Sequence, residues 1–188
     1  FGADFDGNCC DYDTELYLQV DSSLLGLWSV DQLQSWESLI MRTCGTTLLD
    51  VAGEDKSFKV KIGDIPRQGK GFKGKDGQTI YNLPEGLSVL SYDPETCKPI
   101  YTPITKITID ENHACREVKT RSGRSVIVSD NESLCVFDTE LGQVRKMKPT
   151  DAVGKLSPYV KQYPIVGNQF SFELGWWYAV LAADGWKQ

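Results

Sequence analysis

Short runs of β-branched or alternating apolar residues, each bounded by glycine, proline, asparagine or aspartate, recur along the whole sequence. This pattern is typical of β-strands, whereas helical periodicity is scarce. The stretch 121–124 (Arg-Ser-Gly-Arg) predicts a hairpin turn, and a second turn is predicted at 92–96. We therefore predict an all-β fold with strands at 15–20, 58–62, 87–92, 104–109, 114–120, 125–129 and 133–137.

Two stretches depart from the β pattern. Ser29 and Gln32 form a capping-box arrangement, and Leu33 and Ile40 follow at helical spacing, which predicts one amphipathic helix. The stretch 172–186 is apolar on most sides and contains no proline, so it is also predicted to be helical. The stretch 66–79 is rich in glycine and carries four basic residues and one acidic residue. We expect a mobile linker there.

Composition narrows the class of protein. The 188 residues are enough for one domain, or for one domain and a fragment of another. A net charge of −6 argues against a generally cationic nucleic-acid-binding protein. The six cysteines are too sparse for a small disulfide scaffold, and no secretory segment opens the sequence, so we expect reduced thiols and a cytoplasmic location. No apolar run approaches the ~20 residues of a membrane span.

Local motifs predict neither a cofactor nor a metal. The stretch 69–76 imitates a phosphate-binding loop, but Asp76 stands where a serine or threonine would bind magnesium, and no apolar strand precedes it. His113 is the single histidine, and we interpret it as a surface or core residue. Four cysteines lack the paired spacing of zinc ligands and are interpreted as packing thiols: Cys44, Cys97, Cys115 and Cys135.

The first eight residues place Asp4 and Asp6 on either side of Phe5, and alternating carboxylates suit a hard divalent cation. This octet resembles the magnesium-binding loop of multisubunit RNA polymerases, whose pattern is Asn-Ala-Asp-Phe-Asp-Gly-Asp. Asn8 stands where that family has a third carboxylate, so we do not expect the octet alone to bind a metal. The alternative interpretation is an acidic, disordered N-terminus.

A cysteine pair follows the octet directly. The stretch 9–15 reads Cys-Cys-Asp-Tyr-Asp-Thr-Glu and leads into a predicted strand. It resembles the first splicing block of inteins, in which a Cys or Ser is followed five positions later by a Thr that precedes a strand. Thr14 stands five positions after Cys9, so the resemblance selects Cys9 as the first residue of the block and Cys10 as the second. The alternative interpretation is an ordinary thiol pair or a metal ligand.

The predicted hairpin over 118–137 is similar to a second intein block, in which a strand ends in Thr-x-x-His before the next strand begins. Ser129 matches the threonine, and Glu132 occupies the position of the histidine. In the family, that histidine polarises the scissile amide and donates a proton to its nitrogen. A glutamate can donate only while protonated, which requires desolvation to raise its pKa from ~4.3. The alternative interpretation of 129–133 is an exposed polar turn.

A third resemblance lies near the end of the sequence. The stretch 173–186 is similar to the helix of LAGLIDADG homing endonucleases, which are commonly inserted within inteins, and Asp184 matches the terminal acid that would bind the catalytic metal. A single copy of this helix is present, so we expect no DNA cleavage. The alternative interpretation is a plain amphipathic or interface helix.

Together these resemblances imply the N-terminal part of an intein inserted in the metal-binding loop of an RNA polymerase large subunit. The implied organisation is a host segment at 1–8, a splicing domain of the Hint horseshoe fold at 9–165, and the start of an endonuclease insert at 166–188. The implied reaction is a single-turnover N-to-S acyl shift at the Asn8–Cys9 bond. The residues assigned to the site are Cys9, Ser129 and Glu132 as catalytic groups, with Asn8, Cys10, Thr14 and Asn131 beside the scissile bond.

The family completes splicing with a C-terminal part that carries a penultimate histidine, a terminal asparagine and a nucleophile beyond it. We expect a separate C-terminal half to supply these groups, and the net charge of −6 predicts that this half is basic. Two alternatives stay open. The chain could be an association module that is impaired at Glu132, or a truncated endonuclease-containing fragment that binds DNA through 172–186 and the basic stretch.

Overall fold

A computed structural model describes residues 10–157, apart from Asp55, Asp76, Pro94, Cys97 and Asn112 and the side chain of Tyr92. This part of the chain is mainly β-sheet with a few short helices. The strands are β1 (Glu15–Val20), β2 (Phe58–Lys61), β3 (Phe72–Lys73), β4 (Thr79–Asn82), β5 (Leu87–Asp93), β6 (Lys98–Pro103), β7 (Lys106–Ile109), β8 (Cys115–Lys119), β9 (Ser125–Ser129), β10 (Leu134–Asp138) and β11 (Gln143–Met147). The helices are η1 (Ser22–Leu27), α1 (Val30–Cys44), α2 (Leu48–Val51) and η2 (Ile62–Asp64).

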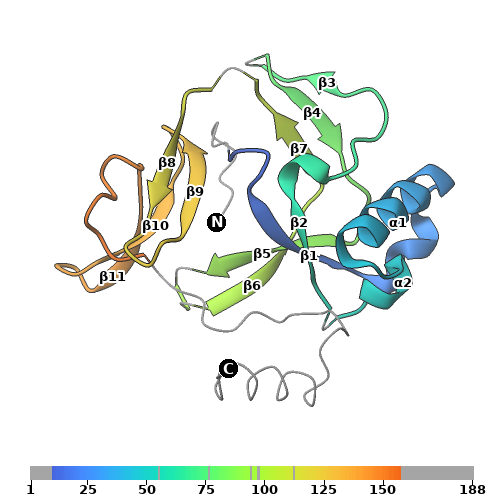
Figure 1. Cartoon of the computed structure of the whole chain (residues 1–188), viewed down its shortest axis with the longest axis horizontal. Coiled ribbons are helices and arrows are strands. Elements are labelled where there is room, and N and C mark those ends of the chain that lie inside the picture. Colours follow the sequence, from blue (N-terminus) through green and yellow to red (C-terminus); the bar gives the residue numbers. More distant parts are fainter. Residues whose placement is uncertain are drawn as a thin grey trace, which may run out of the picture.

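The strands form small antiparallel sheets rather than one large sheet. The largest has the order β2-β1-β5-β6, and the others have the orders β3-β4-β7, β8-β9 and β10-β11. In Figure 1 the four-stranded sheet lies in the middle of the molecule, with α1 and α2 on one side and the strands β8 to β11 on the other. The helices and the β8–β11 region are therefore separated by the central sheet.

The hydrophobic core lies between α1 and the central sheet. Alternation along β1 buries Leu18 and Val20 completely, as expected where one face of a strand meets the core. Trp36 of α1 is also fully buried, and its ring centroid lies 5.9 Å from that of Trp28 and 6.4 Å from that of Phe58. These aromatic contacts join the helix to β2 and fix α1 on the sheet.

The two ends of helix α1 are set by a capping box at Ser29 and by a glycine at position 45. The Ser29 hydroxyl accepts a hydrogen bond from the backbone N–H of Gln32, and the Gln32 side chain accepts one from the backbone N–H of Ser29. The helix ends at Gly45, whose φ of 67° is the left-handed conformation that glycine adopts without strain. The capping box predicted from the sequence is thus confirmed.

Trp36 should carry a large share of the stability of the fold. Replacing Trp36 by alanine should lower the free energy of unfolding by about 3–5 kcal/mol, because a buried aromatic side chain leaves a cavity. Trp36→Phe is the matched control. The indole N–H of Trp36 has no partner among the described residues, so this substitution breaks no hydrogen bond, and it should lower the free energy of unfolding by less than Trp36→Ala. Urea unfolding, followed by the backbone signal in far-ultraviolet circular dichroism, measures the loss of stability in both variants. Equal losses for the two variants would contradict the packing role.

The predicted strands are present with shifted ends, and four further strands were not predicted: β3, β4, β6 and β11. The expectation of a mobile linker at 66–79 is wrong in part, because β3 lies inside this stretch and pairs with β4. The helix predicted at 172–186 lies outside the described residues. No helix in the described part is long and apolar enough to cross a membrane.

Candidate functional site

The first described residues of the chain lie beside β9. Cys10 forms an antiparallel bridge with Val128, and the Asp11 backbone N–H donates a 2.9 Å hydrogen bond to the Ile127 carbonyl. On its other edge β9 pairs with β8, in a register that puts Cys115 opposite Ser129. The segment that begins at Cys10 therefore acts as a third strand on the β8–β9 hairpin. Asn8, Cys9 and Asp184 lie outside the described residues.

The turn that follows Cys10 is held from the opposite side by η2. The Thr14 carbonyl accepts a hydrogen bond from Ile62, and the Tyr12 carbonyl accepts one from Gly63, at 2.9 and 2.8 Å. A Cβ on Gly63 would lie 3.1 Å from Tyr12, so only glycine lets the two segments approach this closely. Thr14 thus contributes its backbone to the anchoring of this turn.

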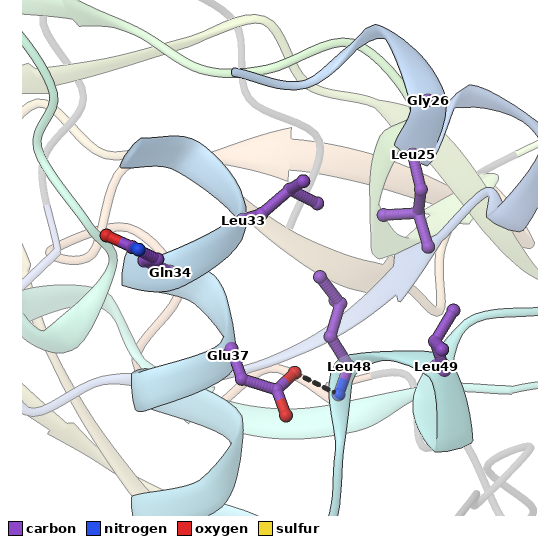
Figure 2. Close-up of a pocket in the computed structure, with 7 residues that line it drawn as sticks. All are labelled: Leu25, Gly26, Leu33, Gln34, Glu37, Leu48 and Leu49. Atoms are coloured by element: carbon purple, nitrogen blue, oxygen red, sulfur yellow. Dashed lines mark hydrogen bonds between the residues drawn. The ribbon is translucent and has the colours of Figure 1, made fainter. Parts of the chain in front are cut away.

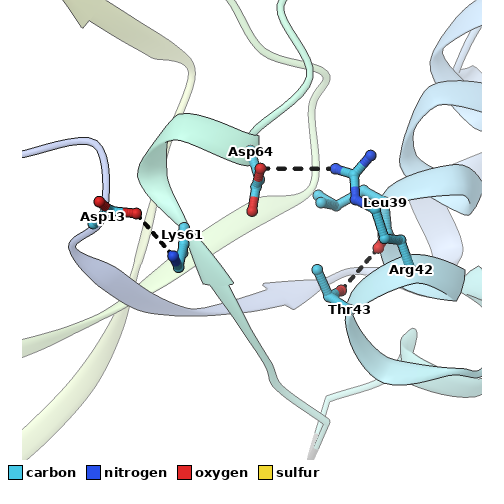
Figure 3. Close-up of polar contacts among 6 residues, drawn as sticks. All are labelled: Asp13, Leu39, Arg42, Thr43, Lys61 and Asp64. Carbon is cyan, nitrogen blue, oxygen red and sulfur yellow. Dashed lines mark hydrogen bonds and ion pairs between the residues drawn. The ribbon is translucent and has the colours of Figure 1, made fainter.

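Two ion pairs connect this anchoring region to the rest of the fold (Figure 3). Lys61 contacts Asp13 at 2.8 Å, and Arg42 of α1 contacts Asp64 of η2 at 3.8 Å. All four side chains are exposed, so each pair contributes little free energy. Their role is geometric, because one pair connects the turn before β1 to the end of β2, and the other connects η2 to the helix that packs on the core.

The end of β9 and the turn after it gather the polar residues of the candidate site. Ser129 is completely buried, and its carbonyl accepts a 3.0 Å hydrogen bond from the backbone N–H of Glu132. Asp130 donates its N–H to the Ala114 carbonyl at 3.3 Å, which holds the turn against the start of β8. Asn131 is exposed at the tip of the turn. The structure therefore brings Ser129 and Glu132 together, close to where Cys10 and Asp11 pair with β9.

Glu132 is a carboxylic acid in an environment that favours its neutral form. Its side chain is only 5% exposed, and burial raises its pKa above the ordinary value of 4.5. A hydrogen bond from the Ser133 backbone N–H (3.1 Å) and the positive charge of Lys146 on β11 partly oppose this increase in pKa. The interpretation of 129–133 as a fully exposed turn is therefore wrong at Glu132. A buried carboxyl with a raised pKa can act as a proton donor.

The stability of the fold should depend on the protonation of Glu132. Because its pKa is raised in the folded state, folding favours the protonated form, so the contribution of Glu132 to stability should be fully present below pH 4.5 and should be lost as pH rises through the folded pKa. Glu132→Gln removes the titration and retains an acceptor for Ser133. At neutral pH this variant should unfold at higher urea concentration than the parent, and the two midpoints should converge below pH 4.5. A constant difference across this pH range would contradict the assignment.

Arg116 is a residue of the site that the sequence pattern did not single out. Its guanidinium forms an ion pair with Asp130, and each partner shifts the pKa of the other, lowering that of Asp130 and raising that of Arg116. Arg116 lies on β8 opposite Val128, the residue bridged by Cys10. The pair therefore fixes the turn between Ser129 and Glu132 to the strand beside it. In the sequence, the only sign of this ion pair is an arginine in one predicted strand and an aspartate just after the next strand.

Among the described residues, His113 and the cysteines form no metal-binding group. His113 contacts Asp110 at 3.0 Å, and the Cys115 thiol points to the His113 carbonyl at 3.6 Å. Within residues 10–157, gaps apart, no three His, Cys, Asp or Glu side chains are close enough together to bind a metal ion. The described cysteines are half-buried at positions 10, 44 and 135 and exposed at 115.

An open apolar groove of about 470 Å³ lies at the helical end of the molecule. Figure 2 shows Leu25, Leu33, Leu48 and Leu49 around it. Its one carboxylate, on Glu37, accepts a 2.6 Å hydrogen bond from the backbone N–H of Leu48 and thereby caps α2. The groove therefore offers an apolar surface and no group for chemistry, unlike the turn at Ser129–Glu132.

Comparisons with known proteins find no relative for this chain. No family model matches it, and no similar protein is found among the curated proteins or the solved structures. The function therefore has to be argued from the site itself.

Proposed function

We propose that this chain is the N-terminal part of an intein, which starts protein splicing by an N-to-S acyl shift at the Asn8–Cys9 bond. The observation that carries this proposal is the pairing of Cys10 and Asp11 with β9. This pairing places the segment that follows Cys9 beside β9. Strand β9 ends at the buried Ser129, and the buried Glu132 lies in the turn after it. The Hint fold, insertion in an RNA polymerase loop and an endonuclease segment that includes Asp184 are parts of the same proposal.

The register of this pairing supports Cys9 rather than Cys10 as the nucleophile. Cys10 is opposite Val128, and in an antiparallel pair each step back along one strand is a step forward along the other. If the pairing continues by one residue, Cys9 would lie opposite Ser129. Side chains of opposed residues share a face of the sheet, so the thiol of Cys9 would face the same side as the Ser129 hydroxyl. Cys10 would face the other side, with Val128.

The proposed step exchanges one bond for another without a co-reactant. The Cys9 sulfur attacks the carbonyl carbon of Asn8, a sulfur–carbon bond forms, and the carbon–nitrogen bond breaks. The proton that sulfur loses is matched by one that the amino nitrogen of Cys9 gains, so the step is an isomerisation. An isolated amide resists this change, and the protein must polarise the carbonyl and protonate the nitrogen.

Ser129 and Glu132 are assigned to these two tasks. The Ser129 hydroxyl, or a backbone N–H of the same turn, stabilises negative charge on the Asn8 oxygen. Glu132 in its protonated form donates to the leaving nitrogen, and its burial and raised pKa keep a larger protonated fraction than an exposed glutamate would have. Arg116 acts as a positioning residue, because its ion pair with Asp130 fixes the turn that presents both groups.

Later steps need groups that the resemblance assigns to a C-terminal part of the intein: a histidine, a terminal asparagine and the next nucleophile. The chain carries a net charge of −6, so we propose a basic partner segment that associates through complementary charge. Raising the salt concentration should then slow the association of the two parts.

An external thiol tests the proposal on the chain by itself. A strong thiol captures the thioester by exchange at the Asn8 carbonyl, so intact-mass measurement should show residues 1–8 as the thiol's thioester and residues 9–188 as a free chain with an N-terminal cysteine. Without thiol, the intact mass should persist. Cleavage at any other bond, or an unchanged mass after prolonged incubation with thiol at several pH values, would overturn the proposal.

A further inference from the structure

The sheet β3-β4-β7 presents one exposed face that the proposed splicing site does not use. The register pairs Phe72 with Ile80, Ile80 with Thr108, and Asn82 with Lys106. Opposed residues, and those two positions apart along a strand, share a face, so these five side chains lie together. Four of them are exposed, and Ile80 between them is half-buried. In Figure 1 this sheet lies apart from the β8–β11 region.

An aromatic ring and an ammonium group meet at the centre of this face. Phe72 is 45% exposed, which is unusual for a phenylalanine, and the Lys106 Nζ lies 5.8 Å from its ring centroid. The backbone just before Phe72 packs closely on β4, because a Cβ on Gly71 would lie 2.6 Å from the Thr79 side chain and 2.8 Å from that of Tyr81. Phe72 is therefore an exposed ring on a supported strand, with a cation within reach.

Two further exposed lysines, Lys70 and Lys75, lie within three positions of Phe72 in the sequence. Neither they nor Lys106 forms an ion pair with any described acidic side chain. Lys73, on the opposite face, instead donates to Gly77 and Thr79 within its own hairpin. The stretch 66–79 carries four basic residues and one acidic residue, in a chain of net charge −6. Positive charge is thus concentrated around β3.

We propose that the face carrying Phe72 and Lys106, together with the nearby Lys70 and Lys75, binds single-stranded nucleic acid. Cations attract a chain of phosphates, and an exposed ring offers a stacking surface to a base. A base that stacks on Phe72 would bring its own phosphate within reach of Lys106. The Lys106 ammonium group would then leave the ring of Phe72 and contact the phosphate instead. In a duplex the faces of the bases are already stacked on one another, so the ring favours single strands. This site does not depend on the splicing chemistry.

Fluorescence anisotropy with the full chain tests the site. Labelled single strands of about 20 nucleotides should bind, while a duplex of the same length and heparin, which has anionic charge but no bases, should bind more weakly. Binding should weaken steeply between ~50 and ~200 mM salt. Equal or tighter binding of the duplex or of heparin would overturn the assignment to single strands, and no binding at ~50 mM salt would overturn the site.

Two sets of variants locate the binding on this face. Phe72→Ala should weaken binding roughly 5- to 100-fold, whereas Phe72→Trp should keep it, since the larger ring also stacks. Lys70→Gln, Lys75→Gln and Lys106→Gln combined should lower the slope of log affinity against log salt by about 2. The matched control removes three exposed lysines elsewhere, at positions 98, 148 and 155. A control that weakens binding as much as the first set would show nonspecific charge and overturn the proposal.

Discussion

Replacing Cys9 by alanine should abolish the thiol-induced release of residues 1–8, whereas replacing Cys10 by alanine should leave it within a few-fold. Cys10 opposes Val128, and the proposal continues this register by one residue, which would put Cys9 opposite Ser129. Removing a nucleophile commonly costs on the order of a thousandfold or more, which here means no detectable cleavage. Intact-mass measurement after incubation with thiol gives the rates for both variants.

Folding must be checked in the same pair, because Cys10 is half-buried and pairs with β9. Circular dichroism and the thermal midpoint should be similar for Cys9→Ala and the parent. Attack by Cys10 would break the Cys9–Cys10 bond instead. Release of residues 1–9 that survives in Cys9→Ala and disappears in Cys10→Ala would therefore identify Cys10 as the nucleophile and contradict the register argument.

Replacing Glu132 by histidine should accelerate the same cleavage at neutral pH by roughly 10- to 100-fold. A histidine has an ordinary pKa near ~6.5 and holds a transferable proton at neutral pH, whereas the ordinary pKa of a carboxyl, ~4.3, lies well below neutral and burial raises it from there. As pH falls toward the pKa of Glu132, the gain in protonated carboxyl offsets the loss of the Cys9 thiolate, so the cleavage rate of the parent should change little over that range. Single-turnover cleavage rates between about pH 5 and 9 measure both profiles.

Glu132→Gln is the control, since it is neutral and of similar size but donates no transferable proton. It should cleave more slowly than the parent, and its rate should fall steadily as pH falls, because only the loss of the Cys9 thiolate then acts on it. Equal rates for Glu132→His, Glu132→Gln and the parent would remove Glu132 from the mechanism. A parent with no detectable cleavage, together with a large gain in Glu132→His, would instead identify the chain as an association module whose chemistry is impaired at this position.

The apolar pattern of the sequence predicted β1 and β9, and it missed the edge strands β6 and β11. β1 and β9 lie where the apolar pattern places them, since one face of each is buried. β6 contains two prolines and is mostly exposed, and β11 has the polar sequence Gln-Val-Arg-Lys-Met. Both lie at the edge of a sheet, where prolines and charges are tolerated and no hydrophobic pattern is required. Such strands form because their backbone hydrogen-bonds to a neighbouring strand, and the local sequence does not show which strand will be the neighbour.

The candidate site was predictable only in its local part. The proximity of Ser129 and Glu132 follows from the turn after β9, and α1 follows from its capping box, because both depend on residues close in sequence. The burial of Glu132 and its ion-paired neighbour Arg116 depend on segments packed from elsewhere in the chain. The pairing of Cys10 with Val128 joins two distant segments, and only the resemblance to intein blocks suggested that they belong together.

Cleavage at the Asn8–Cys9 bond requires Cys9 to lie opposite Ser129, and disulfide trapping measures this directly. Opposed residues of antiparallel strands have Cα atoms about 4.5–5.5 Å apart, within the range of about 4.4–6.8 Å that a disulfide spans. In a chain whose other cysteines are replaced by alanine, Ser129→Cys should form a disulfide with Cys9 under mild oxidation. Ser125→Cys, further back on the same strand, should not. Absence of the first disulfide, or equal amounts of both, would contradict the proposed position of the nucleophile.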